Sequence, residues 1–389
     1  MTGVRHLYVH LPFCAHRCGY CDFVTVTGRD DRHHAYVDAL LAELELERGV
    51  LADGLETIFV GGGTPTFTAP RALARLLDAL PRTDELTVEA NPETVTAGLA
   101  ALLSEHGVNR VSLGAQSFQR HLLETLERRA GPGDVRRAVY VLRVGGFENI
   151  SLDLIYGVPG QSAADLDADL REALALEPEH LSCYELEAKP GTRFTHRHGD
   201  ELRRQAQAME GYLEQVVEQL TRSGYRWYET ANFCRAPALA GGRDLRARHN
   251  LAYWLGCDYL GLGIGAVSTL GAGRRRNTPR LGAYLAALAG GQAPPREREP
   301  LDAETRRRER VMLGLRLDEP LALADVGEAV DMGAARRLEG LGLAHLVTAG
   351  ASEQATLTLT PRGRFLGGGV TAELLAGWSP ERDAPALPA

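Results

Sequence analysis

Residues 8–23 read YVHLPFCAHRCGYCDF, and this stretch joins a short apolar strand to a loop that holds three cysteines. The apolar residues of LYVHL at 7–11 predict a buried strand. Cys14, Cys18 and Cys21 follow it with C-x3-C-x2-C spacing, and they are half of the six cysteines in the chain. Thiolates are preferred ligands of zinc and of iron–sulfur clusters. The stretch therefore predicts a metal-binding loop directly after the first strand.

The number of thiolates bears on which metal group the loop would hold. A closed structural zinc site takes four ligands, and no fourth cysteine lies nearby in the sequence. His16 lies inside the loop between Cys14 and Cys18, where strain opposes its use as a ligand. Three thiolates on a four-iron cluster would leave one iron open to an external ligand. A zinc site with its fourth ligand elsewhere in the chain remains the alternative.

Outward from this loop, short apolar strands alternate with amphipathic helices. Six or seven such β–α units predict a parallel sheet with helices outside it. Polar residues fall at or within successive strands, and the strand ends of a barrel converge on one face. We therefore expect an α/β fold, a partial (β/α)6 barrel of the TIM type, rather than an open doubly wound sheet. The polar residues that decide this preference are Cys14, Gly62, Glu89, Gln116 and Asp153.

The expected elements can be given by residue range. After the first strand we expect strands over 57–62, 86–91, 110–116, 149–157, 180–187 and 226–233. The expected helices cover 32–49, 69–80, 94–106, 119–128, 132–145, 162–176 and, as one long helix, 200–223.

The pattern changes beyond residue 235. A flexible polar loop is expected over 235–248, a strand plus turn over 258–270, and a linker over 290–300, where GGQAPPREREP is rich in Gly, Pro and charge. A smaller α+β region with the strand-like TLTLT at 356–360 follows and looks like a winged helix. We therefore divide the chain into a barrel over 1–235, an extension over 236–300, a C-terminal domain over 301–376 and a disordered tail over 377–389.

Composition excludes several classes of protein. Of 389 residues, 44% are hydrophobic and 24% charged, as in a soluble globular protein. The net charge of −8 argues against nucleic acid as a partner. The longest apolar stretch, Leu251 to Leu270, is interrupted by Asp258 and glycines, so we expect no integral membrane segment. Without an evident signal peptide, a cytoplasmic location with reduced thiols is expected.

The cluster loop resembles that of the radical S-adenosylmethionine (SAM) superfamily. More narrowly it is similar to the HemN/HemW group, which contains oxygen-independent coproporphyrinogen dehydrogenases and heme chaperones. The shared residues are Tyr8, His10, Pro12, Phe13 and, before the last cysteine, Tyr20. The resemblance covers roughly residues 7–370. It implies a barrel of the radical SAM type, a [4Fe–4S] cluster on the three cysteines and SAM on the open iron.

Several other positions follow from this resemblance. On its own, the run GGGTP at 61–65 permits close backbone approach to a ligand or forms an ordinary tight turn. Glu89 at a strand end suits a ribose hydroxyl or an ammonium group, or is simply solvated. Arg128 and Asp153 could form an ion pair with each other. The resemblance instead implies that they and Gln116 contact a second SAM molecule. The SAM contacts that it implies are Tyr8, Tyr20, Gly62, Gly63, Thr64, Glu89, Gln116, Arg128, Asp153 and Val267.

Two features distinguish members within the group. HemN-type dehydrogenases carry a further cysteine two residues after the third, where this chain has Phe23. RHNLAYW at 248–254 matches the H-N-x-x-Y-W motif of the HemW heme chaperones. Neutral imidazole is a common axial ligand of heme iron, and aromatic rings suit the flat macrocycle. Heme contacts are thus implied for His249, Asn250, Tyr253 and Trp254; the alternative is a capped helix start that packs two aromatic rings into a core.

The resemblance is nearest to the HemW members and implies a heme chaperone. Such a protein would bind heme and pass it to acceptors such as respiratory hemoproteins, with the cluster and an exchangeable SAM alongside. No catalytic residue is assigned. The alternatives are an oxygen-independent coproporphyrinogen III dehydrogenase, which decarboxylates its substrate oxidatively, or a HemN-like radical SAM C-methyltransferase. Lys189 departs from the group, which more often has an acidic residue before Pro-Gly-Thr.

Overall fold

A computed structural model of the chain describes residues 3–189, 193–348 and 354–375. The chain divides into two compact units. The first, here called the barrel unit, holds residues 1–226, 231–249 and 258–299, and the second, the C-terminal unit, holds 227–230, 250–257 and 300–389. The division into barrel, extension and C-terminal domain made from the sequence stays a prediction.

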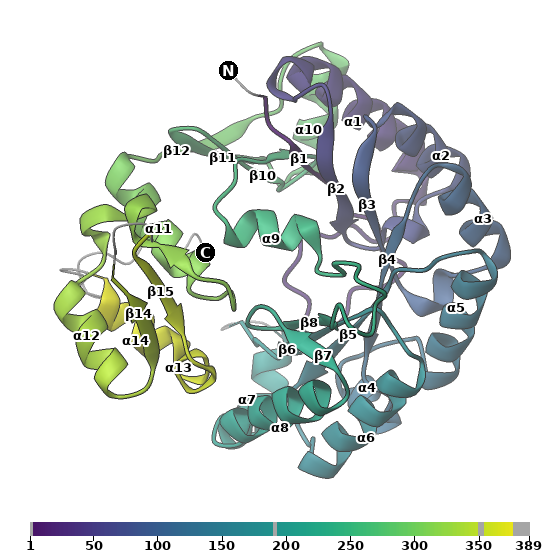
Figure 1. Cartoon of the computed structure of the whole chain (residues 1–389). Coiled ribbons are helices and arrows are strands. Elements are labelled where there is room, and N and C mark those ends of the chain that lie inside the picture. The colour runs from purple at the N-terminus through teal and green to yellow at the C-terminus, as the bar shows by residue number, and fades with distance from the viewer. Residues whose placement is uncertain (1–2, 190–192, 349–353, 376–389) are drawn as a thin grey trace. The chain divides into compact units, whose positions relative to one another are not determined.

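One mixed sheet organises the barrel unit, with the strand order β7-β8-β6-β5-β4-β3-β2-β1-β9 (Figure 1). Strands β1 to β6 pair in parallel, each with the next, β9 runs parallel to β1, and β8 runs antiparallel to β6. The predicted α/β fold with a parallel, partial barrel is therefore confirmed. The strands are β1 His6–Leu11, β2 Leu55–Gly62, β3 Thr83–Ala90, β4 Arg110–Gln116, β5 Ile150–Tyr156, β6 His180–Glu185, β7 Tyr225–Trp227, β8 Asn232–Arg235 and β9 Leu260–Leu262.

Helices follow the strands, and Figure 1 shows α1 to α6 along the outer side of the curved sheet. They are α1 His33–Glu47, α2 Pro70–Ala79, α3 Ala97–Glu105, α4 Arg120–Thr125, α5 Pro132–Val144, α6 Ala163–Ala175, α7 Arg193–Gln205, α8 Met209–Arg222, α9 Arg248–Trp254 and α10 Leu281–Ala289.

The prediction of one long helix over 200–223 is wrong, because α7 and α8 are separate helices. Both are fastened to the segment before α6. The Gln205 amide donates to the carbonyl oxygens of Val158 and Gln161, and the Tyr212 hydroxyl also donates to Gln161. These tertiary bonds stabilise a break that helical periodicity alone does not reveal.

The strands alternate between an apolar outer face and a polar concave face, as a period of two requires. In β1, Leu7 and Val9 are fully buried on one face, whereas His6, Tyr8 and His10 alternate with them on the other. Because neighbouring strands are parallel, their carboxyl ends meet at one edge of the concave face and their amino ends at the other. The concave face thus offers two separate sets of polar side chains.

Residues 258–300 are fastened to α1 through a buried carboxylate. Glu43 has no exposed surface and accepts hydrogen bonds from the Gly263 backbone, the Asn277 amide and the Tyr284 hydroxyl. Arg296 pairs with Glu43 at 3.0 Å. The predicted linker over 290–300 stays a prediction, but it contains a strand that we did not expect. β12 Arg296–Pro300 joins β10 Val267–Leu270 and β11 Gly273–Asn277 in a three-stranded sheet.

The C-terminal unit has its own small core and sheet. Strands pair in the order β13-β15-β14, so the predicted strand over 356–360 is present as β15. The elements are α11 Ala303–Gly314, β13 Leu321–Ala322, α12 Met332–Gly340, β14 Ala344–Val347, β15 Thr356–Leu359, α13 Pro361–Phe365 and α14 Gly367–Leu374. The tail expected to be disordered, 377–389, lies outside the described residues.

Candidate functional site

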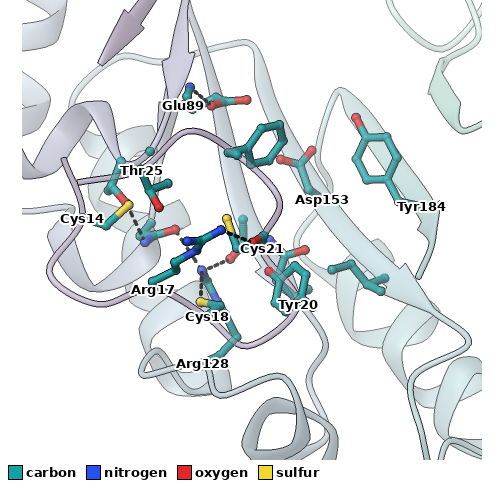
Figure 2. Close-up of a pocket in the computed structure, with 18 of the residues that line it drawn as sticks. Cys14, Arg17, Cys18, Tyr20, Cys21, Thr25, Glu89, Arg128, Asp153 and Tyr184 are labelled. Atoms are coloured by element: carbon teal, nitrogen blue, oxygen red, sulfur yellow. Dashed lines mark hydrogen bonds between the residues drawn. The ribbon is translucent and has the colours of Figure 1, made fainter. Parts of the chain in front are cut away.

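A cavity of about 380 Å³ opens at the carboxyl ends of the barrel strands. Figure 2 shows Cys14, Cys18 and Cys21 on its wall, with Glu89 and Asp153 contributed by strands β3 and β5. Most residues that the sequence assigned to SAM line this same cavity. They are Tyr20, Gly62, Gly63, Thr64, Glu89, Gln116, Arg128 and Asp153.

Two of the expected SAM contacts do not line the cavity. Tyr8 lies on the concave face beneath it, where its hydroxyl is 3.0 Å from Nδ1 of His10 and its ring stacks on Phe59. Val267 is the first residue of β10 and pairs with Arg276 of β11. Tyr8 belongs to β1 itself, whereas Val267 lies in the separate sheet of β10, β11 and β12, and neither residue lines this cavity.

The cysteine loop is held at its base by backbone hydrogen bonds. The Cys14 amide donates to the Val26 carbonyl at 3.0 Å, and the Val26 amide donates to Pro12 at 2.8 Å. His10 donates from Nε2 to the Val24 carbonyl at 2.8 Å. Burial lowers the pKa of His10 to about 4, so the ring is neutral at pH 7. These bonds close the loop so that all three thiols face the cavity.

The three thiols suit a cluster better than a single metal ion. All three are free, and within the described ranges no three His, Cys, Asp or Glu side chains converge to hold one ion. A structural zinc ion needs four ligands at about 2.0–2.3 Å. In a four-iron cluster each cysteine binds a different iron, so the sulfurs are spaced apart. Burial raises the pKa of Cys14 to about 11 and also raises the pKa of Cys21, so iron would have to displace a proton from these thiols.

The glycine run 61–63 at the end of β2 allows close packing between protein segments. A side chain at Gly62 would meet the His10 ring at 2.6 Å, and one at Gly63 would meet the Pro12 carbonyl at 2.5 Å. Gly62 also has a φ of 115°, which side chains rarely adopt. The end of β2 can therefore lie directly against the cysteine loop, and the Gly62 amide donates to Glu89 at 3.0 Å.

Two half-buried carboxyl groups line the cavity and suit a cationic ligand. Burial, together with the nearby Asp153, raises the pKa of Glu89 to about 7, and the hydrogen bond from Gly62 only partly offsets this. Burial also raises the pKa of Asp153, although the Ser112 hydroxyl donates to it at 3.1 Å. A cationic ligand would relieve both groups. SAM carries an ammonium and a sulfonium group, so the residues present fit it.

Arg128 and Asp153 do not form the ion pair that the sequence left open. Instead, Arg128 donates to the Asn91 side-chain oxygen at 2.9 Å, to the Gly114 carbonyl at 2.8 Å and to the Cys18 sulfur at 3.8 Å. Sequence reasoning missed Asn91. Its position two residues after Glu89, at the end of β3, is the signal that would have found it.

Gln116 ends β4 in a strained conformation at the cavity wall. Its φ of 65° lies in the left-handed region, and the pairing of β4 with β5 shifts register between Gly114 and Gln116. Such strain in a residue other than glycine persists where the surrounding structure holds it, and it is frequent at ligand sites. The bulge directs the end of β4 toward the cavity.

The residues implied for heme do not line this cavity. His249 lies at the amino ends of the strands with 1% of its surface exposed, and its Nδ1 is 2.7 Å from the Thr57 hydroxyl. Its ring stacks on Phe59, and its backbone amide donates to Glu85. Burial lowers the pKa of His249 to about 3, so the ring is neutral.

The other three residues of the H-N-x-x-Y-W motif belong to the C-terminal unit. There the guanidinium of Arg316 lies 4.9 Å from the centre of the Trp254 ring, and Arg310 donates to the Trp254 carbonyl. The motif therefore runs from one unit into the other.

Comparison with known proteins gives the family of the chain. Residues 8–173 match the family model described as the radical SAM superfamily. The heme chaperone HemW of Mycobacterium tuberculosis H37Rv is 36% identical over 385 residues, which cover 95% of this chain and 94% of that protein. HemW of Bacillus subtilis is 34% identical, with 96% and 99% covered. The chain belongs to the HemW family.

The fold of this HemW family member is also found in a solved structure. The radical SAM enzyme coproporphyrinogen III oxidase HemN from Escherichia coli matches with a TM-score of 0.77 over 96% of this chain and 90% of that chain. At 22% identity this likeness shows the fold alone. Radical SAM proteins use a [4Fe–4S] cluster and SAM, and the cavity offers both groups suitable residues. No helix in the described ranges combines the length and apolar character needed to cross a membrane.

Proposed function

We propose that this protein is a heme chaperone, which binds heme and transfers it to acceptor proteins such as respiratory hemoproteins. The observation that carries the proposal is the similarity to heme chaperones over 95% of the chain. The H-N-x-x-Y-W residues at 249–254 support the proposal further, because they match the motif of the heme chaperones. Phe23 also supports it, since HemN-type dehydrogenases have a cysteine at that position. A cytoplasmic location belongs to the same proposal.

Cys14, Cys18 and Cys21 would hold the [4Fe–4S] cluster, and SAM would occupy the adjoining cavity and exchange with solvent. When bound, the cluster supplies an electron-transfer centre and an open iron for SAM. Glu89 and Asp153 would face the cationic groups of SAM, and Tyr20 would cover the cavity beside them. The glycines at 62 and 63 would keep the end of β2 close to the cysteine loop that holds the cluster.

His249 is proposed as the heme ligand, but its present position does not admit a macrocycle. The ring is buried between Thr57 and Phe59, so heme can reach it only after the segment that carries His249 moves away from β2. Heme binding would then compete with the hydrogen bond between Thr57 and His249. A released imidazole with an ordinary pKa of about 6.5 is mostly neutral at pH 7, and the neutral ring is the form that binds iron.

A heme titration tests this proposal directly. We expect the anaerobically reconstituted protein to bind one heme, with a shifted absorption band, and His249→Ala to bind it at least about tenfold more weakly. His345→Ala, which changes an exposed histidine, is the matched control. Thr57→Val should bind heme about 2–10-fold more tightly, because a net hydrogen bond of about 0.5–1.5 kcal/mol no longer holds His249 in place.

Loaded protein should then pass heme to an apo-hemoprotein when the two are mixed. Failure of the wild type to bind heme would end the chaperone proposal. Zinc without acid-labile sulfide after reconstitution would contradict the cluster.

One observation keeps an enzyme as the second candidate. Gln116, Arg128 and Asp153, the positions implied for a second SAM, line a single cavity together with the cysteines. This arrangement is compatible with a coproporphyrinogen III dehydrogenase or a C-methyltransferase. Turnover of SAM with decarboxylation of coproporphyrinogen III, or with methyl transfer, would favour these enzymes over the chaperone.

A further inference from the structure

A chain of hydrogen bonds joins two of the three loop cysteines along the cavity wall. The Cys14 sulfur lies 3.4 Å from the Thr64 hydroxyl, and the Asn91 amide donates to that hydroxyl at 3.1 Å. Arg128 donates to the Asn91 oxygen at 2.9 Å and to the Cys18 sulfur at 3.8 Å. Figure 2 shows the guanidinium beside Cys18. Cys14 and Cys18 are thus connected to a single cation.

The chemistry of Arg128 fixes how Asn91 is turned. A guanidinium can only donate, so Asn91 turns its oxygen toward Arg128 and its nitrogen toward Thr64. The Thr64 oxygen accepts from Asn91, and once Cys14 is a thiolate it carries no proton, so the Thr64 hydroxyl must then donate to it. Both sulfurs therefore receive a donated hydrogen, an arrangement that stabilises negative charge on them.

The positive charge at the start of the chain is held in place. Arg128 also donates to the Gly114 carbonyl at 2.8 Å. Its Nε is buried without a hydrogen-bond partner in the described structure, at the wall of the cavity. A guanidinium keeps its proton throughout the pH range in which proteins are folded, so Arg128 carries a positive charge.

The third cysteine is held differently. Cys21 takes no part in the chain from Arg128, and its thiol faces the Phe23 backbone amide instead. Arg17 donates to the carbonyl oxygen of Cys21 at 3.2 Å and acts on its thiol through charge, without a hydrogen bond to the sulfur among the described residues. The charge of Arg128 thus acts on two of the three thiolates through directed hydrogen bonds.

We propose that Arg128 and Asn91 are positioning residues that raise the reduction potential of the cluster. The inference rests on the cluster ligation proposed above. In the [4Fe–4S]2+/1+ couple, one electron enters from an external one-electron reductant, and no bond forms or breaks. Hydrogen bonds to the sulfurs and nearby positive charge stabilise the more negative, reduced state. In a water-poor cavity such interactions are stronger than in bulk solvent.

The test is a redox titration of the anaerobically reconstituted protein without SAM, followed by electron paramagnetic resonance and visible absorption. Arg128→Met should shift the midpoint potential to more negative values by the largest amount. Arg128→Lys keeps the charge but loses the fork of donors, so its shift should be smaller. Thr64→Val removes only the final donor to Cys14 and should also give a smaller negative shift.

Thr66→Val is the matched control. The Thr66 hydroxyl lies two residues from Thr64 but is hydrogen-bonded to Thr94 at 2.6 Å. Thr94 donates to the backbone carbonyl of Asn91, not to the side chain that contacts Arg128 and Thr64, so Thr66→Val leaves the donors to the two sulfurs in place. The midpoint potential of the Thr66→Val variant should equal that of the wild type. Iron and sulfide contents are measured for every variant, so that a shift is compared only between fully loaded proteins.

A wild-type midpoint potential in fully loaded Arg128→Met would overturn the inference. A shift that appears only when SAM is added would also overturn it, because Arg128 would then act solely as a SAM contact. If Arg128→Met holds no cluster, the midpoint potentials of fully loaded Arg128→Lys and Thr64→Val are compared with that of the wild type instead. Wild-type potentials in both of these variants would overturn the inference. If the wild type itself binds no iron–sulfur cluster, the proposed ligation fails, and the inference fails with it.

Discussion

The two ends of the concave face of the barrel both carry polar residues, but these residues differ in burial and in hydrogen bonding. At the carboxyl ends of the strands, Glu89 and Asp153 lie in an open cavity with their pKa values raised by burial. At the amino ends, Thr57 is fully buried and hydrogen-bonded to both His6 and His249, at 3.0 and 2.7 Å. One end has polar groups that a ligand would stabilise, and the other has a closed network.

This difference separates two ways of building a binding site. A site with buried, poorly solvated charges is prepared for a ligand of opposite charge, and it costs stability while it stays empty. A satisfied network contributes to stability, and a ligand can enter only by breaking it. The cluster and SAM would therefore bind to a formed cavity, whereas heme would bind only after a rearrangement at His249.

The largest effect is expected at the open end. Glu89→Gln should weaken SAM binding by about 10–100-fold, because a charge-assisted hydrogen bond contributes about 1.5–3 kcal/mol. Isothermal titration of the cluster-loaded protein measures this. Glu93→Gln, an exposed glutamate in the same EANPE segment, should bind SAM like the wild type. Equal affinities for the two variants would show that Glu89 does not face the ligand.

The next effect concerns the pH dependence of stability without SAM. The pKa of Glu89 rises from 4.5 to about 7 on folding, so its contribution to stability is present at low pH and is lost as the pH rises through this interval. Between about pH 5 and pH 7 this loss amounts to about 2 kcal/mol at 1.36 kcal/mol per unit. Thermal unfolding of Glu89→Gln should therefore show an advantage over the wild type that grows with pH.

The groups that face Glu89 are Asp153, Arg110 and Tyr8. They are unchanged in Glu89→Gln, so they contribute similarly to both proteins. An advantage that stays constant between about pH 5 and pH 7 would mean that Glu89 titrates normally in the folded protein, and the contrast between the two ends would be lost.

The smallest effect is expected at the closed end. Thr57→Val removes the hydroxyl shared by His6 and His249 and should lower the free energy of unfolding by about 1–2 kcal/mol. Thr87→Val is the matched control, because the Thr87 hydroxyl is equally buried but has no hydrogen-bond partner in the described structure. It should be neutral or stabilising. A similar loss in both variants would assign the effect to packing rather than to the network.

Much of the fold could be predicted because its signals are local. The alternation of strands and helices up to residue 187 follows from hydrophobic periodicity, and the structure has a strand in each predicted position. The failures occurred where tertiary contacts override local pattern. Gln205 and Tyr212 hold a break between α7 and α8, and Arg296 turns a Pro- and charge-rich segment into β12 by pairing with Glu43.

The site residues also divide into those that the sequence reveals and those whose partners depend on tertiary contacts. The spacing of Cys14, Cys18 and Cys21 is visible in the sequence because one short loop carries all three. Asn91 was not found, since its role depends on Thr64 and Arg128, which lie 27 and 37 residues away along the chain. His249 was found as part of a motif, but its burial beside Thr57 comes from a contact across 192 residues.

The sequence by itself determined the parallel β–α order, the cysteine loop and most of the polar residues that line the cavity. These depend on periodicity and on spacing within single segments, which the chain carries wherever it folds. Only the tertiary structure decided that Arg128 bonds to Asn91 and Cys18 instead of pairing with Asp153, and that His249 is enclosed. Such partners are chosen by the burial and hydrogen-bond geometry of strands brought together from distant parts of the chain.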